Sequence, residues 1–169
     1  MGGYFSTAFD DDTVPVRLKE EYDGAEPSAN SVTALNLLRV AEMTGKEEFS
    51  IYAEKVFSSC STMLAQNSHA LPQLLVALNF ARKKKQKITL AGELFSPEMN
   101  ELRSVIDERY LPGTVIMHVS PESAALQRFP ETIQTGSARP QVTVCIDRTC
   151  NLPVSDRKML GETLDNALP

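Results

Sequence analysis

Apolar side chains recur at three- and four-residue intervals through the first half of the chain, which is the spacing of amphipathic helices. The first run begins at Ser28 or Asn30, either of which can cap a helix, and ends near Thr44. Gly45 follows, and glycine suits the left-handed conformation just beyond a helix. The expected buried positions of this helix are Val32, Leu35, Leu37, Leu38, Val40, Ala41 and Met43.

Two further helices are predicted before residue 87. One opens at residues 46–48 and continues until residues 66–68 break the pattern. The other begins near Leu71, with Pro72 suited to its first turn. Because the connections are short, we expect antiparallel neighbours. The expected buried positions are Phe49, Tyr52, Ala53, Val56, Phe57, Cys60, Met63 and Leu64 in the second helix, and Leu71, Leu74, Leu75, Leu78 and Ala81 in the third.

In the second half, short β-rich runs alternate with helix-start signals. Residues 87–92, 114–119 and 141–146 are the predicted strands. A serine cap, a proline and an acid stand together at 96–98 and again at 120–122, and they predict two helices, the second near Leu126. Ser155 is expected to cap a last helix, and residues 134–140 to form a loop. The expected buried helical positions are Met99, Leu102, Val105, Ile106, Met159, Leu160 and Leu164.

This change of period predicts a mixed fold in two parts. Residues 1–86 would form antiparallel helices, and residues 87–169 a small α/β segment with about three strands in a parallel or mixed sheet. A length of 169 residues suits one domain, or one and a half small domains.

The composition is that of an ordinary globular protein, with 42% hydrophobic and 23% charged residues. The net charge of −5 argues against a nucleic-acid or anionic-membrane partner. The basic run at 82–87 is short and falls where a helix should end, a position that favours cations. No apolar run approaches the ~20 residues that span a bilayer, and the N-terminus lacks the pattern of a signal peptide. We therefore expect a cytoplasmic protein that does not contact the membrane.

The densest group of ionisable residues precedes the first helix. Asp23, Glu26 and Asn30 would face the same way if Glu26 began the helical turn. Paired carboxylates perform acid–base chemistry when burial and repulsion separate their pKa values. Arg17 and Lys19 suit a sugar hydroxyl, a carboxylate or a phosphate group. The structural alternative is that acids before a helix simply complement its dipole.

Cys145 and Cys150 flank four residues that could turn a strand back on itself and bring the two sulfurs together. Three interpretations are open: buried structural thiols, which cores commonly contain, a reversible disulfide, or half of a metal site. No second Cys or His pair with zinc spacing accompanies them, so we expect no metal. Cys60 lies on the apolar side of the second helix and is expected in the core. Without a secretory signal, all three thiols are expected to be reduced.

Five segments carry a resemblance to a known family. They read GGYFSTAFDDD at 2–12, VRLKEEYDGAEPSANSVTALNLLRVAEMTG at 16–45, LPQLLVAL at 71–78, RYLP at 109–112 and VCIDRTCNLPV at 144–154. Together they resemble the late part of the family that contains spermatogenesis-associated protein 20, whose bacterial members are described as thioredoxin-domain-containing proteins of unknown function. The resemblance covers almost the whole chain, and its DGAEPSANS motif is fairly specific.

The resemblance implies a longer protein, in which a thioredoxin-like domain is joined to an (α/α)6 toroid. That toroid is the six-hairpin architecture of N-acylglucosamine 2-epimerases and many glycosidases. This chain would hold the last toroid helices and a C-terminal α/β segment. Implied partners are a small carbohydrate and the parent's thioredoxin-like domain, with self-association where toroid neighbours are missing. The implied edge of a sugar-type pocket consists of Arg17, Lys19, Glu20, Asp23, Glu26, Ser28 and Asn30.

The resemblance gives a location and no reaction. Epimerases of this architecture use histidines for proton transfer, whereas His69 and His118 lie in no matching motif. His69 is expected to be exposed in a loop, and His118 to be a satisfied core or sheet-face residue. No glycine-rich nucleotide loop or nucleophile elbow indicates a cofactor. The remaining alternatives are a non-catalytic interaction module and a redox accessory acting through Cys145 and Cys150.

Overall fold

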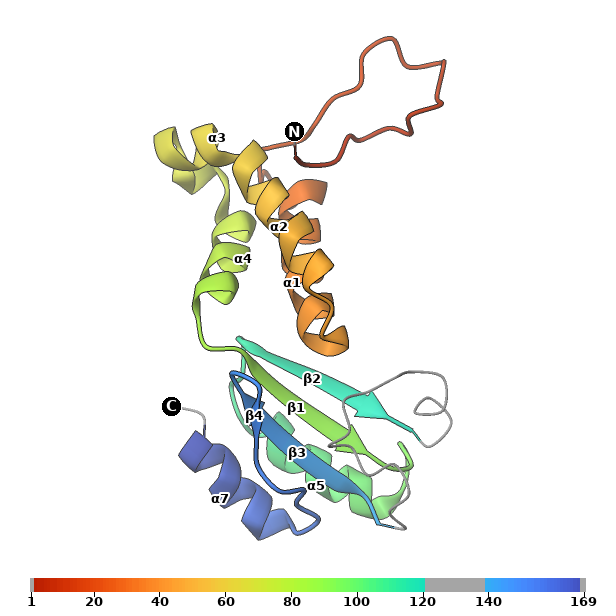
Figure 1. The fold of residues 1–169 in the computed structure, drawn as a ribbon, viewed down its shortest axis with the longest axis vertical. Coiled ribbons are helices and arrows are strands. Elements are labelled where there is room, and N and C mark those ends of the chain that lie inside the picture. Colours follow the sequence, from red (N-terminus) through yellow and green to blue (C-terminus); the bar gives the residue numbers. More distant parts are fainter. Residues whose placement is uncertain (1, 121–138, 168–169) are drawn as a thin grey trace. The chain divides into compact units, whose positions relative to one another are not determined.

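A computed structural model describes residues 2–120 and 139–167 of the chain. The fold divides into two compact units, Met1–Lys83 and Lys84–Pro169. The first unit contains four α-helices and a short 3-10 helix, while the described part of the second combines two helices with a sheet (Figure 1). The chain is therefore a mixed α/β protein. Among the described residues, no helix is long and apolar enough to cross a membrane.

The elements of the first unit are all helical. They are α1 (Ala29–Thr44), α2 (Glu47–Ser59), α3 (Ser61–Gln66), the 3-10 helix η1 (Ser68–Ala70) and α4 (Pro72–Arg82).

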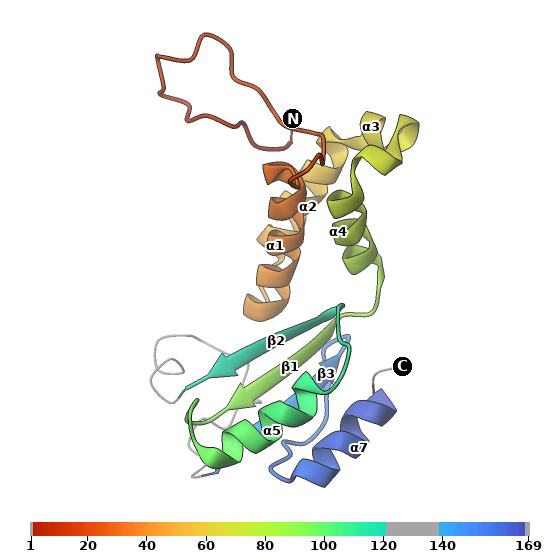
Figure 2. The same ribbon diagram turned by 180° about the vertical axis from the view of Figure 1, so that it is seen from behind.

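The predicted ends of α1 are confirmed. The Ser28 hydroxyl accepts a hydrogen bond from the backbone N–H of Ser31, which caps the start of the helix. Gly45 has a φ of 70°, and its N–H donates to the Ala41 carbonyl, which closes the last turn. This left-handed φ favours glycine. Helix α1 packs against both α2 and α4 (Figures 1 and 2).

The predicted second helix is two helices. The chain bends at Cys60, which is buried, and α3 continues only to Gln66. The buried side of each helix is also narrower than the apolar pattern predicted: Val32, Met43, Tyr52 and Leu75 are exposed. Residues that do fill this core include Ala34, Leu35, Leu38, Ala41, Ala53, Val56, Leu71, Leu74, Ala77 and Phe80. Small residues such as Ala34, Ala53 and Ala77 therefore occupy the helix contacts.

The second unit contains a mixed sheet with the strand order β2-β1-β3-β4. Strand β1 pairs in parallel with β2 and antiparallel with β3, and a turn leads from β3 directly into β4. The three predicted strands are confirmed, whereas β4 was not predicted. The elements are β1 (Gln86–Ala91), α5 (Pro97–Asp107), β2 (Thr114–Val119), β3 (Gln141–Ile146), β4 (Thr149–Cys150) and α7 (Arg157–Ala167).

Helices α5 and α7 lie on one side of the sheet, as Figure 2 shows. Ile88 and Leu90 of β1 and Val142 and Val144 of β3 point to this side, where they meet the buried face of the helices. The predicted face of α5 is confirmed in full. The helix residues of this core are Met99, Leu102, Val105, Ile106, Leu160 and Leu164.

Two other expectations differ from the structure. Helix α7 is capped by Asp156, whose carboxylate accepts from the N–H of Met159, rather than by Ser155, and Met159 itself is exposed. The basic run at 82–87 begins where α4 ends, as predicted, and its last residue, Lys87, lies within β1. The predicted helix near Leu126 lies outside the described residues, as does most of the predicted loop at 134–140.

Candidate functional site

The segment before α1, residues 2–22, forms a loop that leaves the helices and returns to them (Figure 1); we call it the N-terminal loop. Its two arms are joined by the backbone N–H of Ser6, which donates to the Leu18 carbonyl at 2.9 Å. The Arg17 guanidinium also crosses the loop and donates to the Thr7 carbonyl at 2.9 Å. The Lys19 ammonium donates to the carbonyl of Gly2. Both predicted cations therefore stabilise the loop on which they lie.

Asn30 attaches this loop to α1. Its amide oxygen accepts from the N–H of Tyr4 at 2.7 Å, and its amide nitrogen donates to the Tyr4 carbonyl at 2.9 Å. The same nitrogen donates to the Glu20 carbonyl at 3.0 Å. The Asn30 side chain is buried, so these three bonds satisfy a polar group that would otherwise destabilise the fold. Asn30 is therefore a structural residue that joins the two arms of the loop to the helix.

Asp23 joins the starts of two helices. One carboxylate oxygen accepts from the N–H of Ser28, just before α1, at 2.8 Å. The other accepts from the N–H groups of Gln73 and Leu74, in the first turn of α4, at 2.9 and 3.2 Å. These donors have no partner within their own helices, and a carboxylate complements the positive end of each dipole.

Two opposing effects set the pKa of Asp23. Burial would raise the pKa, because the charged form loses its hydration. Hydrogen bonds from the Ser28 N–H, the Ser31 hydroxyl, the Leu74 N–H and the Ser28 hydroxyl together outweigh burial and lower the pKa below its ordinary value of 3.8. Asp23 is therefore an ionised carboxylate in the folded protein. A group in that state cannot serve as a general acid near neutral pH.

Glu26 does not join Asp23 and Asn30. Helix α1 begins at Ala29, so Glu26 precedes the first helical turn and lies exposed, while the other two side chains are buried. The three side chains were predicted to face the same way only if the helix began at Glu26. The helix is instead capped by Ser28 and begins at Ala29, so this condition is not met. Glu20 is also exposed. The structure thus separates the seven candidates into three buried supports, Asp23, Ser28 and Asn30, and four residues with exposed or half-buried side chains, Arg17, Lys19, Glu20 and Glu26.

The loop presents aromatic rings beside its cations. The Arg17 guanidinium carbon lies 4.1 Å from the ring centroid of Phe5 and 5.7 Å from that of Phe9, and the Lys19 nitrogen lies 4.7 Å from the Phe5 centroid. The Phe9 side chain is 90% exposed. Neither Phe5 nor Phe9 was among the candidates, although their spacing of four residues before two cations is visible in the sequence.

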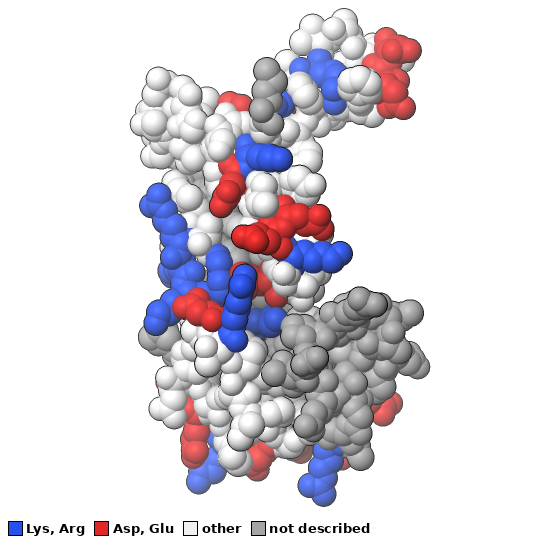
Figure 3. All heavy atoms as spheres, in the orientation of Figure 1, with Lys and Arg blue, Asp and Glu red and all other residues white. Residues whose placement is uncertain are grey.

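Two buried polar atoms of the loop have no hydrogen bond to any residue that the structure describes: Nε of Arg17 and the hydroxyl oxygen of Thr7. The Arg17 guanidinium therefore has donor capacity left after its bond to the Thr7 carbonyl. At the far end of the loop, Figure 3 shows acidic side chains gathered where Asp10, Asp11 and Asp12 lie in the chain. The Asp11 carboxylate accepts hydrogen bonds from the hydroxyl and the backbone N–H of Thr13. Both bonds lower the pKa of Asp11, and the hydroxyl bond has the larger effect.

In the second unit, Cys145 and Cys150 form a disulfide across the β3–β4 hairpin. The prediction that the intervening residues turn the strand back is confirmed. The interpretation as separate, reduced thiols is wrong for this pair, because the register places the two cysteines directly opposite each other. Cys60 is a buried free thiol, and burial raises its pKa. No group of three or more potential metal ligands occurs among the described residues.

The histidines take no part in either region. His69 lies exposed in η1, as expected. His118 lies in β2 and is partly buried, and its Nε2 has no hydrogen bond in the part of the chain that the structure describes. The expectation that His118 is fully satisfied is therefore wrong for this atom.

The chain is similar to one segment of longer animal proteins. It is 31% identical over 161 residues to an uncharacterised protein of Caenorhabditis elegans, B0495.5. This match covers 95% of the chain and 22% of that relative. It is also 30% identical to spermatogenesis-associated protein 20 of the rat, and that match covers 95% of the chain and 22% of the relative. The human protein of the same name is likewise 30% identical, and its match covers 94% of the chain and 21% of the relative.

The resemblance predicted from the five motifs is thereby confirmed, and the chain is a homologue of part of spermatogenesis-associated protein 20. It spans about a fifth of the length of these relatives, a share consistent with a C-terminal part. No family model matches the chain. No solved structure matches it either.

Proposed function

We propose that the helical unit contributes one edge of a carbohydrate-binding pocket in an (α/α)6 toroid, and that this edge binds the ligand without catalysing its reaction. The supporting homology extends over nearly the whole chain, but only over about a fifth of each relative. Most of such a pocket would therefore be formed by sequence that this chain does not contain. The helices would be the toroid hairpins, and the N-terminal loop would be the part that meets the ligand.

The observation that carries the proposal is the arrangement of Arg17 over Phe5 and Phe9. Binding sites for small molecules combine aromatic surface with a few convergent polar groups. The exposed ring of Phe9 offers a flat apolar surface for the CH groups of a sugar ring. Arg17 is partly exposed, and a guanidinium suits carboxylates and hydroxyl oxygens. An acidic or hydroxyl-rich sugar matches both features.

The remaining exposed candidates support the same proposal. Glu20 and Glu26 are exposed carboxylates, and carboxylates accept hydrogen bonds from sugar hydroxyls. Asp23, Ser28 and Asn30 would act indirectly, because their bonds fix the loop and the helix starts. The Asp23 carboxylate already accepts from backbone N–H groups and from the Ser28 and Ser31 hydroxyls, so we assign it no proton transfer.

The test is titration of a panel of neutral and acidic monosaccharides, followed by calorimetry and by saturation-transfer NMR of the chain. We expect weak, saturable binding that is stronger for an acidic sugar such as glucuronate than for glucose. Arg17→Met should weaken it by about tenfold, the scale of one lost charged hydrogen bond, and Phe9→Ala should also weaken it because the apolar surface for the sugar ring is lost. Tyr110→Ala is the matched control, because Tyr110 is also a highly exposed aromatic residue but lies in the other unit. Absence of saturable binding to every sugar would overturn the proposal.

A second candidate is an interaction module, and it rests on a different observation. Helices α2 and α4 expose apolar side chains that their own unit does not cover: Ile51, Tyr52, Leu75 and Val76. Exposed apolar side chains such as these can form part of a protein interface. In a toroid these faces would meet neighbouring helices of the longer protein, and outside it they would meet a partner. Unchanged sugar binding on substitution of these residues would separate this role from that of the loop.

A further inference from the structure

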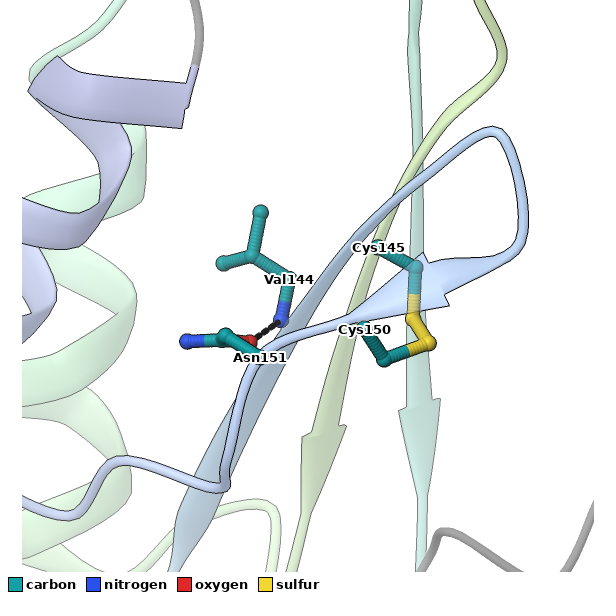
Figure 4. Close-up of a disulfide and its surroundings, with 4 residues drawn as sticks. All are labelled: Val144, Cys145, Cys150 and Asn151. Atoms are coloured by element: carbon teal, nitrogen blue, oxygen red, sulfur yellow. Dashed lines mark hydrogen bonds between the residues drawn. A yellow bond between two sulfur atoms is a disulfide. The ribbon is translucent and has the colours of Figure 1, made fainter.

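The Cys145–Cys150 disulfide lies at the end of the sheet, where β3 turns into β4 (Figure 4). The two cysteines are directly opposite each other, one pair inward from the turn. The next pair, Val144 and Asn151, is joined by the Asn151 N–H donating to the Val144 carbonyl and by the Val144 N–H donating to the Asn151 side-chain oxygen, at 3.0 and 2.7 Å. The cysteines therefore occupy a non-hydrogen-bonded position, where side chains on opposite strands come closest.

The two sulfurs have different surroundings. Cys145 lies on β3 between two neighbouring strands and is only 6% exposed. Cys150 lies on β4, which is the last strand of the sheet, and is partly exposed. Lys87 of β1 is directly opposite Cys145 on the same face of the sheet.

The disulfide closes a hairpin whose second strand is very short. Strand β4 has only two residues, Thr149 and Cys150. The turn places Asp147 and Arg148 at φ values of 46° and 69°, the left-handed region that two-residue hairpin turns need and that residues other than glycine adopt at a cost. The disulfide and the hydrogen bonds between Val144 and Asn151 together hold the two strands at the turn.

The turn is also bonded to the chain just before β1. The Asp147 carboxylate accepts from the Lys85 N–H at 2.9 Å, and the Asp147 N–H donates to the Lys85 carbonyl at 2.9 Å. Lys85 is the second residue of the second unit. Opening of the hairpin would therefore release the backbone at the point where the chain enters the sheet.

We propose that Cys145–Cys150 is a reversible thiol–disulfide exchange site for a dithiol reductant, with Cys150 as the sulfur that is attacked. A thiolate of the reductant forms a bond to Sγ of Cys150, and the Cys145–Cys150 bond breaks with Cys145 leaving as a thiolate. The second thiolate of the reductant then attacks the mixed disulfide and releases Cys150. Two electrons and two protons pass from the dithiol to the cysteine pair, and the dithiol becomes a disulfide. This inference is independent of the proposed sugar binding.

The first test is equilibration of the native Cys60→Ser chain in buffers with graded ratios of reduced to oxidised dithiothreitol at neutral pH. Mass spectrometry after alkylation counts the free thiols. We expect a reversible two-electron transition without denaturant, and faster amide exchange at Lys85 and Asp147 in the reduced form. A disulfide that is reduced only after unfolding, or amide exchange that is the same in both forms, would overturn the proposal.

The second test assigns the attacked sulfur. The variants Cys60→Ser/Cys145→Ser and Cys60→Ser/Cys150→Ser each leave one thiol of the pair, and both are checked by circular dichroism. Because Cys150 is more accessible, we expect the variant that keeps it to form a mixed disulfide with oxidised glutathione about tenfold faster than the variant that keeps Cys145. Equal rates, or faster reaction at Cys145, would contradict the assignment. The equilibrium measurement on the intact pair decides reversibility even if a variant is poorly folded.

Discussion

The carboxylate of Asp23 lies 2.9 Å from the backbone nitrogen of Gln73, a residue fifty positions further along the chain. The other oxygen of the same carboxylate holds the start of α1. One acidic side chain thus connects the first turns of two helices. This relationship explains why an aspartate stands at this point, and it removes Asp23 from the set of residues free to bind a ligand.

Replacement of Asp23 by asparagine should destabilise the helical unit. The amide keeps one acceptor oxygen, but it loses the charge and brings an NH2 group close to backbone donors. Hydrogen bonds to charged groups contribute about 1.5–3 kcal/mol each, so we expect the free energy of unfolding to fall by about 2 kcal/mol or more. Urea denaturation followed by circular dichroism measures this change. Glu26→Gln is the control, because Glu26 is an exposed acid of the same segment; a similar loss in both variants would contradict the role of Asp23.

The stability of the chain should also depend on pH through Asp23. Its folded-state pKa is lowered from 3.8, so the unfolded state binds the proton more readily. The contribution of Asp23 is therefore fully present above about pH 4 and is lost as the pH falls through the folded-state pKa. Denaturation at a series of acidic pH values should show a smaller slope in Asp23→Asn than in the native chain. Identical slopes would show that Asp23 does not carry this dependence.

Replacement of Asn30 by alanine should release the N-terminal loop. Three hydrogen bonds are lost, and the Tyr4 N–H loses its acceptor. A buried polar group left unsatisfied costs about 1–3 kcal/mol, so we expect a loss of about 2 kcal/mol together with faster amide exchange at Tyr4. Asn36→Ala is the matched control, because Asn36 is exposed on the same helix. Unchanged exchange at Tyr4 would contradict an anchoring role for Asn30.

The contacts of Asp23 could not be predicted from the sequence, unlike the features that depend on local residues. Local signals predicted strands β1, β2 and β3, the Ser28 cap, Gly45 and the whole buried face of α5, because each depends on residues within one turn or one strand. The bonds of Asp23 join positions fifty residues apart, and no local pattern contains that information. The same segment therefore suggested converging carboxylates, whereas the later start of α1 leaves Glu26 outside.

In the second unit, the pairing of the two cysteines could not be predicted from the sequence either, although they are only five residues apart. The sequence indicated that the residues between Cys145 and Cys150 could form a turn, and they do. It left open whether the thiols pair, since that depends on register: only with these two cysteines opposite each other can a bond form. Strand β4 was missed because two residues give no periodicity to detect.

The chain should self-associate through the exposed faces of α2 and α4. Ile51, Tyr52 and Val76 are all more than two-fifths exposed, and burial of such side chains between copies is favourable by about 25 cal/mol per Å². Light scattering should show a mass that rises with concentration, and Ile51→Glu with Val76→Glu should reduce it. The control is Phe95→Glu, because Phe95 is a highly exposed apolar residue of the other unit. A compact monomer at every concentration would contradict the prediction.

Arg109 should contribute more to stability than Arg103, although both form ion pairs. The Arg109 guanidinium is half-buried and donates to Asp165 of α7 at 2.9 Å and to the Val105 carbonyl, so it joins two helices. The Arg103–Asp107 pair is exposed and lies within α5. Exposed pairs contribute about 0–1 kcal/mol, so Arg103→Met should have almost no effect. Arg109→Met should lower the free energy of unfolding by about 1–2 kcal/mol, since it also removes the donor of a partly buried hydrogen bond to the Val105 carbonyl. Equal effects in urea denaturation would show that the contact between α5 and α7 depends on apolar packing alone.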